Sequence, residues 1–270
     1  MLKNAHGHAK KHLRVMPTYC FWGIHFYISA FLYKFAAKTN IAFMKIGIIV
    51  AMDKEFVQLK SLLSDATVER YHHKDFVIGN IGEKEIVIQK CGIGKVNSSI
   101  GTVEMIDRFS PDLIISTGVA GGADTEMNVT DVVVGTDYCY HDAYCGDECE
   151  FGQILGMPAK FEAPKELIEK AINLGTDIPV HAGLIVSGEW FVNTKEKMQA
   201  ILDNFPAAKA VDMESCSIAQ TCHIYHVPFI SFRIISDIPL KDNKAAQYFD
   251  FWARLANGSF NVTKKFLEII

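Results

Sequence analysis

The chain has 270 residues and 49% hydrophobic content, so it is long enough to bury a full core as one large α/β domain or two small ones. Its net charge of -4 is uneven, because residues 1–43 carry six Lys or Arg and no acid, which leaves -10 on the rest of the chain. An acidic body without a basic stripe argues against nucleic-acid binding and suits a small neutral or cationic ligand.

Seven cysteines are scattered through apolar or strand-like contexts, an odd number that is typical of reduced thiols in a cytoplasmic protein. His141, Cys145 and Cys149 are close enough in sequence to raise a metal hypothesis. They lack the Cys-x-x-Cys spacing that is usual for structural zinc. We therefore expect neither a metal nor a cofactor.

The first 43 residues differ from the rest of the chain. Val15 to Tyr33 contains no charged residue, has about the length of a membrane span and follows positive residues, as in a signal sequence or anchor. Its cleavage site is poor, and the alternative is a disordered or mis-assigned upstream extension. We divide the chain into this extension, residues 1–43, and one domain, residues 44–270. We expect a cytoplasmic protein, or a membrane-anchored or exported one if the extension is a real anchor or signal.

From Met44 onward the pattern alternates between strands and helices. Residues 45–51 are an apolar run typical of a buried strand, and residues 53–63 follow with helical spacing. Glu55 lies in the first turn of this helix, where the helix dipole favours its ionised form. Further strands are predicted at residues 76–81, 85–90, 111–117, 131–136, 181–187 and 227–237, and further helices at residues 98–108, 164–174 and 249–270.

Two glycine-containing loops follow predicted strands. Gly92 and Gly94 open the helix at residues 98–108 and resemble a phosphate cradle, but their spacing matches neither the P-loop nor the dinucleotide fingerprint. Residues 118–123 directly follow the strand at 111–117. Glycines there let the backbone approach a ligand closely because no Cβ intervenes, although a tight turn alone would also explain them.

Two other segments carry residues suited to binding. Residues 138–158 form a long irregular stretch with several glycines, which indicates a lid or a subunit-contact loop. Trp190 and Phe191 follow the strand at 181–187. Consecutive aromatics at a strand end usually pack in the core, but they can also stack on a planar ring.

The acidic residues in the last third of the domain are the strongest functional signal. Glu214 stands at the mouth of an apolar helix, and the strand at 227–237 ends on Ser236 and Asp237. Buried strands deliver their last residues to the carboxyl edge of a sheet, where α/β folds bind ligands, so Glu214 and Asp237 are predicted to face one pocket. Arg233, inside the same strand, either pairs with a site carboxylate or neutralises another buried acid.

Seven runs occur in a specific order: Met44-Lys-Ile-Gly-Ile-Ile-Val-Ala-Met-Asp-Lys-Glu55, Gly92-Ile-Gly-Lys-Val96, Thr117-Gly-Val-Ala-Gly-Gly122, Tyr140-His-Asp-Ala143, Gly183-Leu-Ile-Val-Ser-Gly188, Val211-Asp-Met-Glu214 and Ile235-Ser-Asp237. With these runs the chain from Met44 onward resembles the bacterial 5′-methylthioadenosine/S-adenosylhomocysteine nucleosidases of the purine nucleoside phosphorylase superfamily. The resemblance implies a three-layer α/β sandwich with a mixed central β-sheet flanked by helices. It also implies a homodimer that hydrolyses the bond between adenine N9 and the ribose carbon.

The chemistry of that bond explains the roles that the resemblance implies. Positive charge builds on the sugar and negative charge on the leaving purine, so one acid must serve the base while a carboxylate and water serve the sugar. By resemblance, Asp237 protonates adenine N7, with a pKa raised by burial, and Glu55 stays ionised to deprotonate the water. The implied substrate-binding residues are Glu214 at the ribose hydroxyls, Met213 beneath the ribose, Phe191 stacked on adenine, Val192 at the purine edge, Gly121 near the substrate and Ser236 beside Asp237.

The chain departs from common members of that family at two positions. Val119 stands where Ser is frequent, which puts a hydrogen bond near the catalytic water in doubt, and Asp212 stands where Glu is frequent. Taken singly, Glu55 and Glu214 also fit ordinary acids at helix starts, and Asp237 fits a cap or turn residue.

Three alternative functions remain open. One is an aminodeoxyfutalosine or futalosine hydrolase, and another is a catalytically degenerate nucleoside-binding protein. The third, a purine nucleoside phosphorylase, usually has arginines for phosphate near the first strand and the central glycine loop. This chain has Asp53-Lys54-Glu55 and Val119-Ala120-Gly121 there, and a carboxylate repels phosphate.

Overall fold

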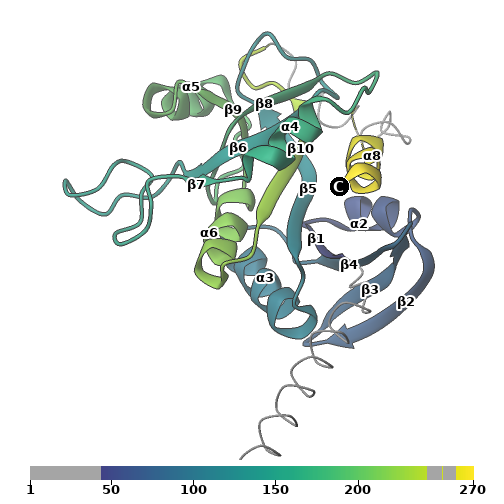
Figure 1. Ribbon diagram of the computed structural model, residues 1–270. Coiled ribbons are helices and arrows are strands. Elements are labelled where there is room, and N and C mark those ends of the chain that lie inside the picture. Colours follow the sequence, from purple (N-terminus) through teal and green to yellow (C-terminus); the bar gives the residue numbers. More distant parts are fainter. Residues whose placement is uncertain (1–43, 242–250, 252–259) are drawn as a thin grey trace, which may run out of the picture. The chain divides into compact units, whose positions relative to one another are not determined.

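The computed structural model describes residues 44–241, 251 and 260–270 (Figure 1). The predicted signal or anchor segment lies outside the described residues, as does most of the first half of the helix predicted at 249–270. Among the helices of the described ranges, none combines the length and the apolar character needed to cross a membrane. Because residues 1–43 lie outside the described ranges, the division of the chain at residue 43 stays a prediction.

The described residues form one ten-stranded mixed sheet with helices packed on it. The strands are β1 (Lys45–Val50), β2 (Ser64–Tyr71), β3 (Lys74–Ile81), β4 (Lys84–Lys90), β5 (Leu113–Gly122), β6 (Val132–Tyr140), β7 (Phe161–Glu162), β8 (Val180–Ser187), β9 (Ala208–Asp212) and β10 (Phe229–Asp237). The helices are α2 (Asp53–Lys60), α3 (Lys95–Phe109), α4 (Lys165–Ile172), α5 (Lys195–Asn204), α6 (Ser215–Tyr225) and α8 (Phe260–Ile269).

The sheet consists of a closed ring of five strands, an open arm of four and the short strand β7, which pairs with β6. β5 pairs with β10 along one edge, and on the other edge it pairs first with β1 and then, at its end, with β9. The ring closes from β9 through β8 and β6 back to β10, while the arm runs from β1 through β4 and β3 to β2. Because parallel and antiparallel pairs are combined in this sheet, the predicted α/β fold with a mixed central sheet is confirmed. The closure of the ring was not predicted.

Apolar side chains on β1, β5 and β10 form the centre of the core. All nine residues of β10 are buried, as expected of a strand that is covered on both faces. Figure 1 shows α3 and α6 side by side on one side of these strands and α2 and α8 on the other. The rings of Phe232 and Phe266, with centroids 4.8 Å apart, attach α8 to β10, and the hydroxyls of Thr117 and Thr263, 3.1 Å apart, attach it to β5.

Several boundaries differ from those predicted. β5 does not end at Thr117 but continues to Gly122, because its glycine-rich part keeps pairing with β10 and β9. β6 extends to Tyr140, so the irregular stretch begins at residue 141 rather than 138. β2 was missed because it is a mostly exposed strand at the edge of the sheet, without a buried apolar face. The helix α5 and the strand β9 were also missed.

Candidate active site

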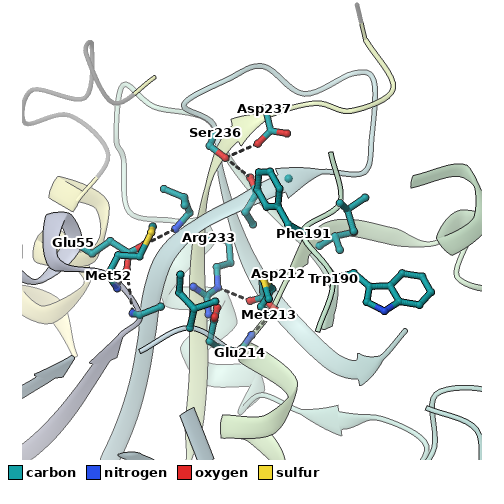
Figure 2. A pocket seen from close by; sticks show the side chains of 17 residues that line it. Met52, Glu55, Trp190, Phe191, Asp212, Met213, Glu214, Arg233, Ser236 and Asp237 are labelled. Carbon is teal, nitrogen blue, oxygen red and sulfur yellow. Dashed lines mark hydrogen bonds and ion pairs between the residues drawn. The ribbon is translucent and has the colours of Figure 1, made fainter. Parts of the chain in front are cut away.

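One pocket collects all eight predicted site residues on its wall (Figure 2). It lies where the carboxyl ends of β1, β5, β9 and β10 approach one another, and the loop after β8 completes it. The eight are Glu55, Gly121, Phe191, Val192, Met213, Glu214, Ser236 and Asp237. In Figure 2 the three acids approach the cavity from the start of α2, the start of α6 and the end of β10. The structure thus brings these residues together, and their roles stay predictions.

The ends of β5 and β9 form one side of the pocket. These two strands run antiparallel and pair only through Gly121 with Val211 and Gly122 with Ala210, a contact that we call the β5–β9 seam. Gly121 and Val211 both line the pocket. A Cβ added at Gly121 would meet no protein atom closer than 3.7 Å. An added methyl group would therefore lie in ordinary van der Waals contact with Pro239 and Met198, neither of which lines the pocket, so Gly121 contributes its backbone to the pocket wall.

A bulge at the end of β10 directs two polar side chains into the pocket. Ile235 pairs with Ala120, whereas Asp237 pairs with Gly121, so Ser236 is an extra residue on β10. Successive side chains of a regular strand point to opposite faces. The bulge removes that alternation, and both Ser236 and Asp237 line the pocket.

Glu55 is held by backbone donors at the start of α2. It is 1% exposed, its Oε2 accepts the N–H groups of Ala51 (3.0 Å) and Met52 (2.9 Å), and its Oε1 accepts that of Val119 (3.1 Å). Burial raises the pKa of Glu55 above its ordinary value, although these N–H groups and the Arg233 guanidinium lower it. The helix start was expected to govern its ionisation, but burial outweighs that effect. A fixed carboxylate of raised basicity suits a general base.

Asp237 is 5% exposed at the end of β10. The Ser236 hydroxyl lies 2.7 Å from its Oδ1 and 3.2 Å from the carbonyl oxygen of Ala120, and it can donate to either. When it donates to Asp237, the Ser236 hydroxyl fixes one oxygen of that carboxyl group, a contact that Figure 2 marks with a dashed line.

Glu214 precedes α6 and is 6% exposed. Its Oε1 accepts the N–H of Gly94 at 2.9 Å. Burial, with the negative charges of Asp212 and Glu55, raises the pKa of Glu214 to about 7, while Arg233 and the Gly94 N–H act in the opposite direction. Glu214 therefore changes its charge near neutral pH.

The guanidinium of Arg233 is 1% exposed beneath the acids. Its Nε lies 2.6 Å from Oδ2 of Asp212 and 3.0 Å from the hydroxyl of Ser215. Burial alone would lower the pKa of Arg233, but the carboxylates of Asp212, Glu214 and Glu55 raise it. Arg233 was expected either to pair with a site carboxylate or to neutralise another buried acid. Its direct ion pair is with the buried acid Asp212, and its effect on the pKa values of Glu55 and Glu214 acts at longer range.

The loop after β8 places aromatic side chains at the mouth of the pocket. Trp190 is 51% exposed and Phe191 is 55% exposed, so neither is a core residue. Val192 is buried and anchors the loop from the inside. Figure 2 shows the Trp190 ring directed away from the three acids, which leaves Phe191 as the aromatic side chain nearer to them.

Two glycines with roles in the site were not identified from the sequence. The loop around Gly94 had been considered as a phosphate cradle, yet its N–H binds Glu214. A Cβ at Gly118 would lie 2.7 Å from Nη1 of Arg233 and 2.7 Å from Oε1 of Glu55. Gly118 therefore allows these two side chains to approach the backbone of β5. Glycines at those positions were visible in the sequence, but the groups they accommodate were not.

Met52 also lines the pocket and was missed, because a Met after an apolar strand carries no functional signal. Within the described ranges, no three His, Cys, Asp or Glu side chains are grouped so that they could hold a metal ion. His141, Cys145 and Cys149, whose closeness in the sequence raised the metal hypothesis, belong to those ranges and form no such group there.

The fold and the pocket place the chain in the phosphorylase superfamily, whose family model matches residues 45–268. A 5′-methylthioadenosine/S-adenosylhomocysteine nucleosidase from Desulfotalea psychrophila is 40% identical over 228 residues, which cover 83% of this chain and 97% of the relative. Within the superfamily, the chain belongs to the 5′-methylthioadenosine/S-adenosylhomocysteine nucleosidase family, as the resemblance predicted.

Solved structures agree with this membership. The Neisseria meningitidis nucleosidase of the same name, in complex with methylthio-immucillin-A, matches with a TM-score of 0.79 and 31% identity over 84% of this chain and 100% of that one. The futalosine hydrolase of Helicobacter pylori matches with a TM-score of 0.77 and 28% identity over 84% of this chain and 98% of that one. The fold is thus shared by enzymes that bear two different names, and substrate preference depends on the site.

Proposed function

We propose that this chain hydrolyses the N-glycosidic bond of 5′-methylthioadenosine and of S-adenosylhomocysteine, and also that of 5′-deoxyadenosine, releasing adenine and the ribose product. The observation that carries the proposal is the convergence of Glu55, Glu214 and Asp237 on one pocket from three separate elements. The names of the relatives from Desulfotalea psychrophila and Neisseria meningitidis support the same activity.

In the proposed reaction, the purine leaves as its ring accepts a proton. Asp237 donates that proton to adenine N7, and the Ser236 hydroxyl orients its carboxyl group. Phe191 stacks on the adenine from the mouth of the pocket, and the Val192 backbone binds the purine edge. A general acid at the leaving group is required because an unprotonated purine is a poor leaving group.

The sugar becomes positively charged as the bond breaks, and water attacks it. Glu55 accepts the proton of that water, since its carboxylate is fixed by three N–H groups and its pKa is raised by burial. Glu214 in its ionised form accepts hydrogen bonds from the ribose hydroxyls and stabilises the cationic sugar, and Met213 packs beneath the ring. Val119 contributes its backbone N–H to Glu55, so this contact does not depend on a side-chain hydroxyl at that position.

The position of the carboxylates favours water over phosphate as the nucleophile. At the start of α3, the N–H of Gly94 binds Glu214 and the N–H of Lys95 binds Oε1 of Glu189 at 2.6 Å. Backbone N–H groups at a helix start often bind phosphate, but both of these are already bound to carboxylates. A buried, negatively charged Glu55 would also repel phosphate. Both observations favour hydrolysis over phosphorolysis.

A substrate panel tests the proposal. The purified chain is incubated without phosphate, in parallel, with methylthioadenosine, adenosylhomocysteine, 5′-deoxyadenosine and aminodeoxyfutalosine, and adenine release is measured. We expect release from the first three. Ribose 1-phosphate formed only with added phosphate would make the chain a phosphorylase. Cleavage of aminodeoxyfutalosine alone would make it a futalosine-type hydrolase, and binding without any cleavage would make it a degenerate nucleoside-binding protein.

We further propose that the chain forms a homodimer, acts in methionine salvage and is cytoplasmic. Tyr144, Phe151 and Leu155, in the stretch predicted to be a lid or subunit contact, are between 44% and 65% exposed, as expected of an apolar contact surface. The free cysteines of the described residues fit a reducing compartment.

Two measurements test these proposals. Light scattering after size exclusion should give twice the mass of one chain. Cell fractionation should recover the full-length protein with the cytoplasmic fraction.

A further inference from the structure

The start of α3 binds two carboxylates that come from opposite sides of the site. The N–H of Gly94 donates to Glu214, and the next N–H, that of Lys95, donates to Glu189 at 2.6 Å. Glu189 directly precedes Trp190 and Phe191, the aromatic residues at the mouth of the pocket. One helix start therefore connects the predicted ribose-binding carboxylate with the predicted purine-binding loop.

A second contact holds the same loop. Asp142, after the end of β6, accepts the backbone N–H of Glu189 at 2.9 Å through its Oδ2. The two oxygens of Asp142 also bind the ammonium group of Lys95, at 2.8 and 3.0 Å. Lys95 and Glu189 are thus joined both directly and through Asp142. We call these three residues the α3 latch.

The glycine at the start of α3 makes this arrangement possible. Gly94 has a φ of 96°, which favours glycine, and a Cβ there would lie 2.6 Å from Oε2 of Glu189. The Glu189 carboxylate therefore lies directly against the backbone of the residue that binds Glu214. A displacement of the aromatic loop would break the contact between Glu189 and Lys95, because only one residue separates Glu189 from Phe191.

We infer that Glu189 is a positioning residue of this site: through the α3 latch it fixes the loop bearing Trp190 and Phe191 relative to Glu214, and thereby sets the affinity for the purine. The inference rests on the proposed function. Glu189 itself touches no reacting atom in this scheme. Its loss should therefore weaken binding of the purine while the chemical step keeps its rate.

The test compares full-length wild type, Glu189→Ala and Glu189→Gln. We measure kcat and KM for methylthioadenosine and, by calorimetry, the Kd of adenine, which reports binding without turnover. For Glu189→Ala we expect KM and the adenine Kd to rise about tenfold, as for the loss of one hydrogen bond to a charged group, with kcat within about twofold. Glu189→Gln should restore both constants to within about threefold of wild type, because an amide oxygen also accepts the Lys95 N–H.

Glu166→Ala serves as the matched control, since Glu166 is an exposed acid in the first turn of α4, outside the pocket lining. An adenine Kd of Glu189→Ala equal to that of the control would overturn the inference. So would a fall in kcat without a change in KM, or a failure of Glu189→Gln to restore affinity. If wild type binds adenine but does not cleave methylthioadenosine, the proposed function fails while the adenine measurements still decide the role of Glu189.

Discussion

The charged side chains of this pocket are buried, so each interacts mainly with other groups of the site and little with solvent. Glu55, Glu214, Asp237 and Arg233 are each at most 6% exposed. Buried charges persist only with partners, and here the partners are backbone N–H groups, hydroxyls and the other charges of the site. Changing one of these groups should therefore alter both the chemistry and the titration of its neighbours.

The first residue-scale prediction concerns the two proposed proton-transfer groups. Glu55→Gln and Asp237→Asn keep the shape of each side chain but remove its ability to exchange a proton. Each should lower kcat for methylthioadenosine by about 10²- to 10⁴-fold, the usual contribution of general acid–base catalysis. Stopped assays of adenine release measure the effect. Glu166→Gln and Asp107→Asn, the same substitutions at exposed positions outside the pocket, should keep wild-type rates. Wild-type kcat in either site variant would remove that residue from the mechanism.

The second residue-scale prediction follows from the pKa of Glu214, which is raised from 4.5 to about 7. The folded state binds this proton more tightly than the unfolded state. The stability that Glu214 contributes is therefore fully present below about pH 4.5 and is lost as the pH rises through about 7. In urea unfolding, wild type should lose about 2 kcal/mol relative to Glu214→Gln between about pH 5 and about pH 7.5. A constant difference between the two proteins over that range would contradict the raised pKa.

At the scale of elements, β5 supports the site with two glycines that have opposite surroundings. A Cβ added at Gly118 would lie 2.7 Å from Arg233 and from Glu55, whereas a Cβ added at Gly121 would lie 3.7 Å from Pro239, an ordinary contact distance. The same strand thus has one glycine that leaves room for charged side chains and another whose position tolerates a methyl group.

Alanine substitutions at Gly118 and Gly121 test this difference between the two positions. Gly118→Ala should lower the free energy of unfolding by about 1–3 kcal/mol, because Arg233 or Glu55 must move. Gly121→Ala should leave the free energy of unfolding within about 0.5 kcal/mol of wild type and KM within about twofold, because its methyl group would contact Pro239 and Met198, which do not line the pocket. Chemical denaturation and steady-state kinetics on both variants check the pair. Equal stability losses would show that both positions serve packing alone.

The sequence identifies elements whose burial is encoded locally and misses contacts that depend on the whole fold. Apolar runs were sufficient to predict β1 and β10. Glu55, Glu214 and Asp237 were selected by the ordered runs that resemble a known family, since each acid taken singly also fits an ordinary helix-start or turn residue. The contact of Gly94 with Glu214 joins residues 120 positions apart, so no local pattern contains it. The direction of the Glu55 pKa shift was missed for the same reason, since burial is a property of the fold.

For the whole molecule, the first strand of the described residues and the family match begin at the same residue. β1 starts at Lys45, and the superfamily match covers residues 45–268. The domain over residues 44–270 should therefore be sufficient for folding and activity. This remains a proposal about the extension, which lies outside the described residues.

Expression from Met44 tests that division. We expect the shortened protein to match the full chain in kcat, KM and Tm, because every residue assigned to the pocket lies within the retained part. Parallel purification and thermal unfolding of both proteins provide the comparison. A shortened protein that is insoluble, or whose KM for methylthioadenosine differs severalfold, would show that residues 1–43 contribute to the domain.

The β5–β9 seam has a consequence for how a ligand affects motion in the sheet. Only two residue pairs join these strands, followed by one hydrogen bond from the Ala123 N–H to the carbonyl oxygen of Lys209 at 3.0 Å, and residues of both strands line the pocket. A molecule that fills the pocket touches both strands of this short seam and should keep them paired. Deuterium uptake at the amides of residues 121–123 and 209–211 should accordingly slow when adenine saturates the protein, while uptake in the distant β2–β3 hairpin stays unchanged.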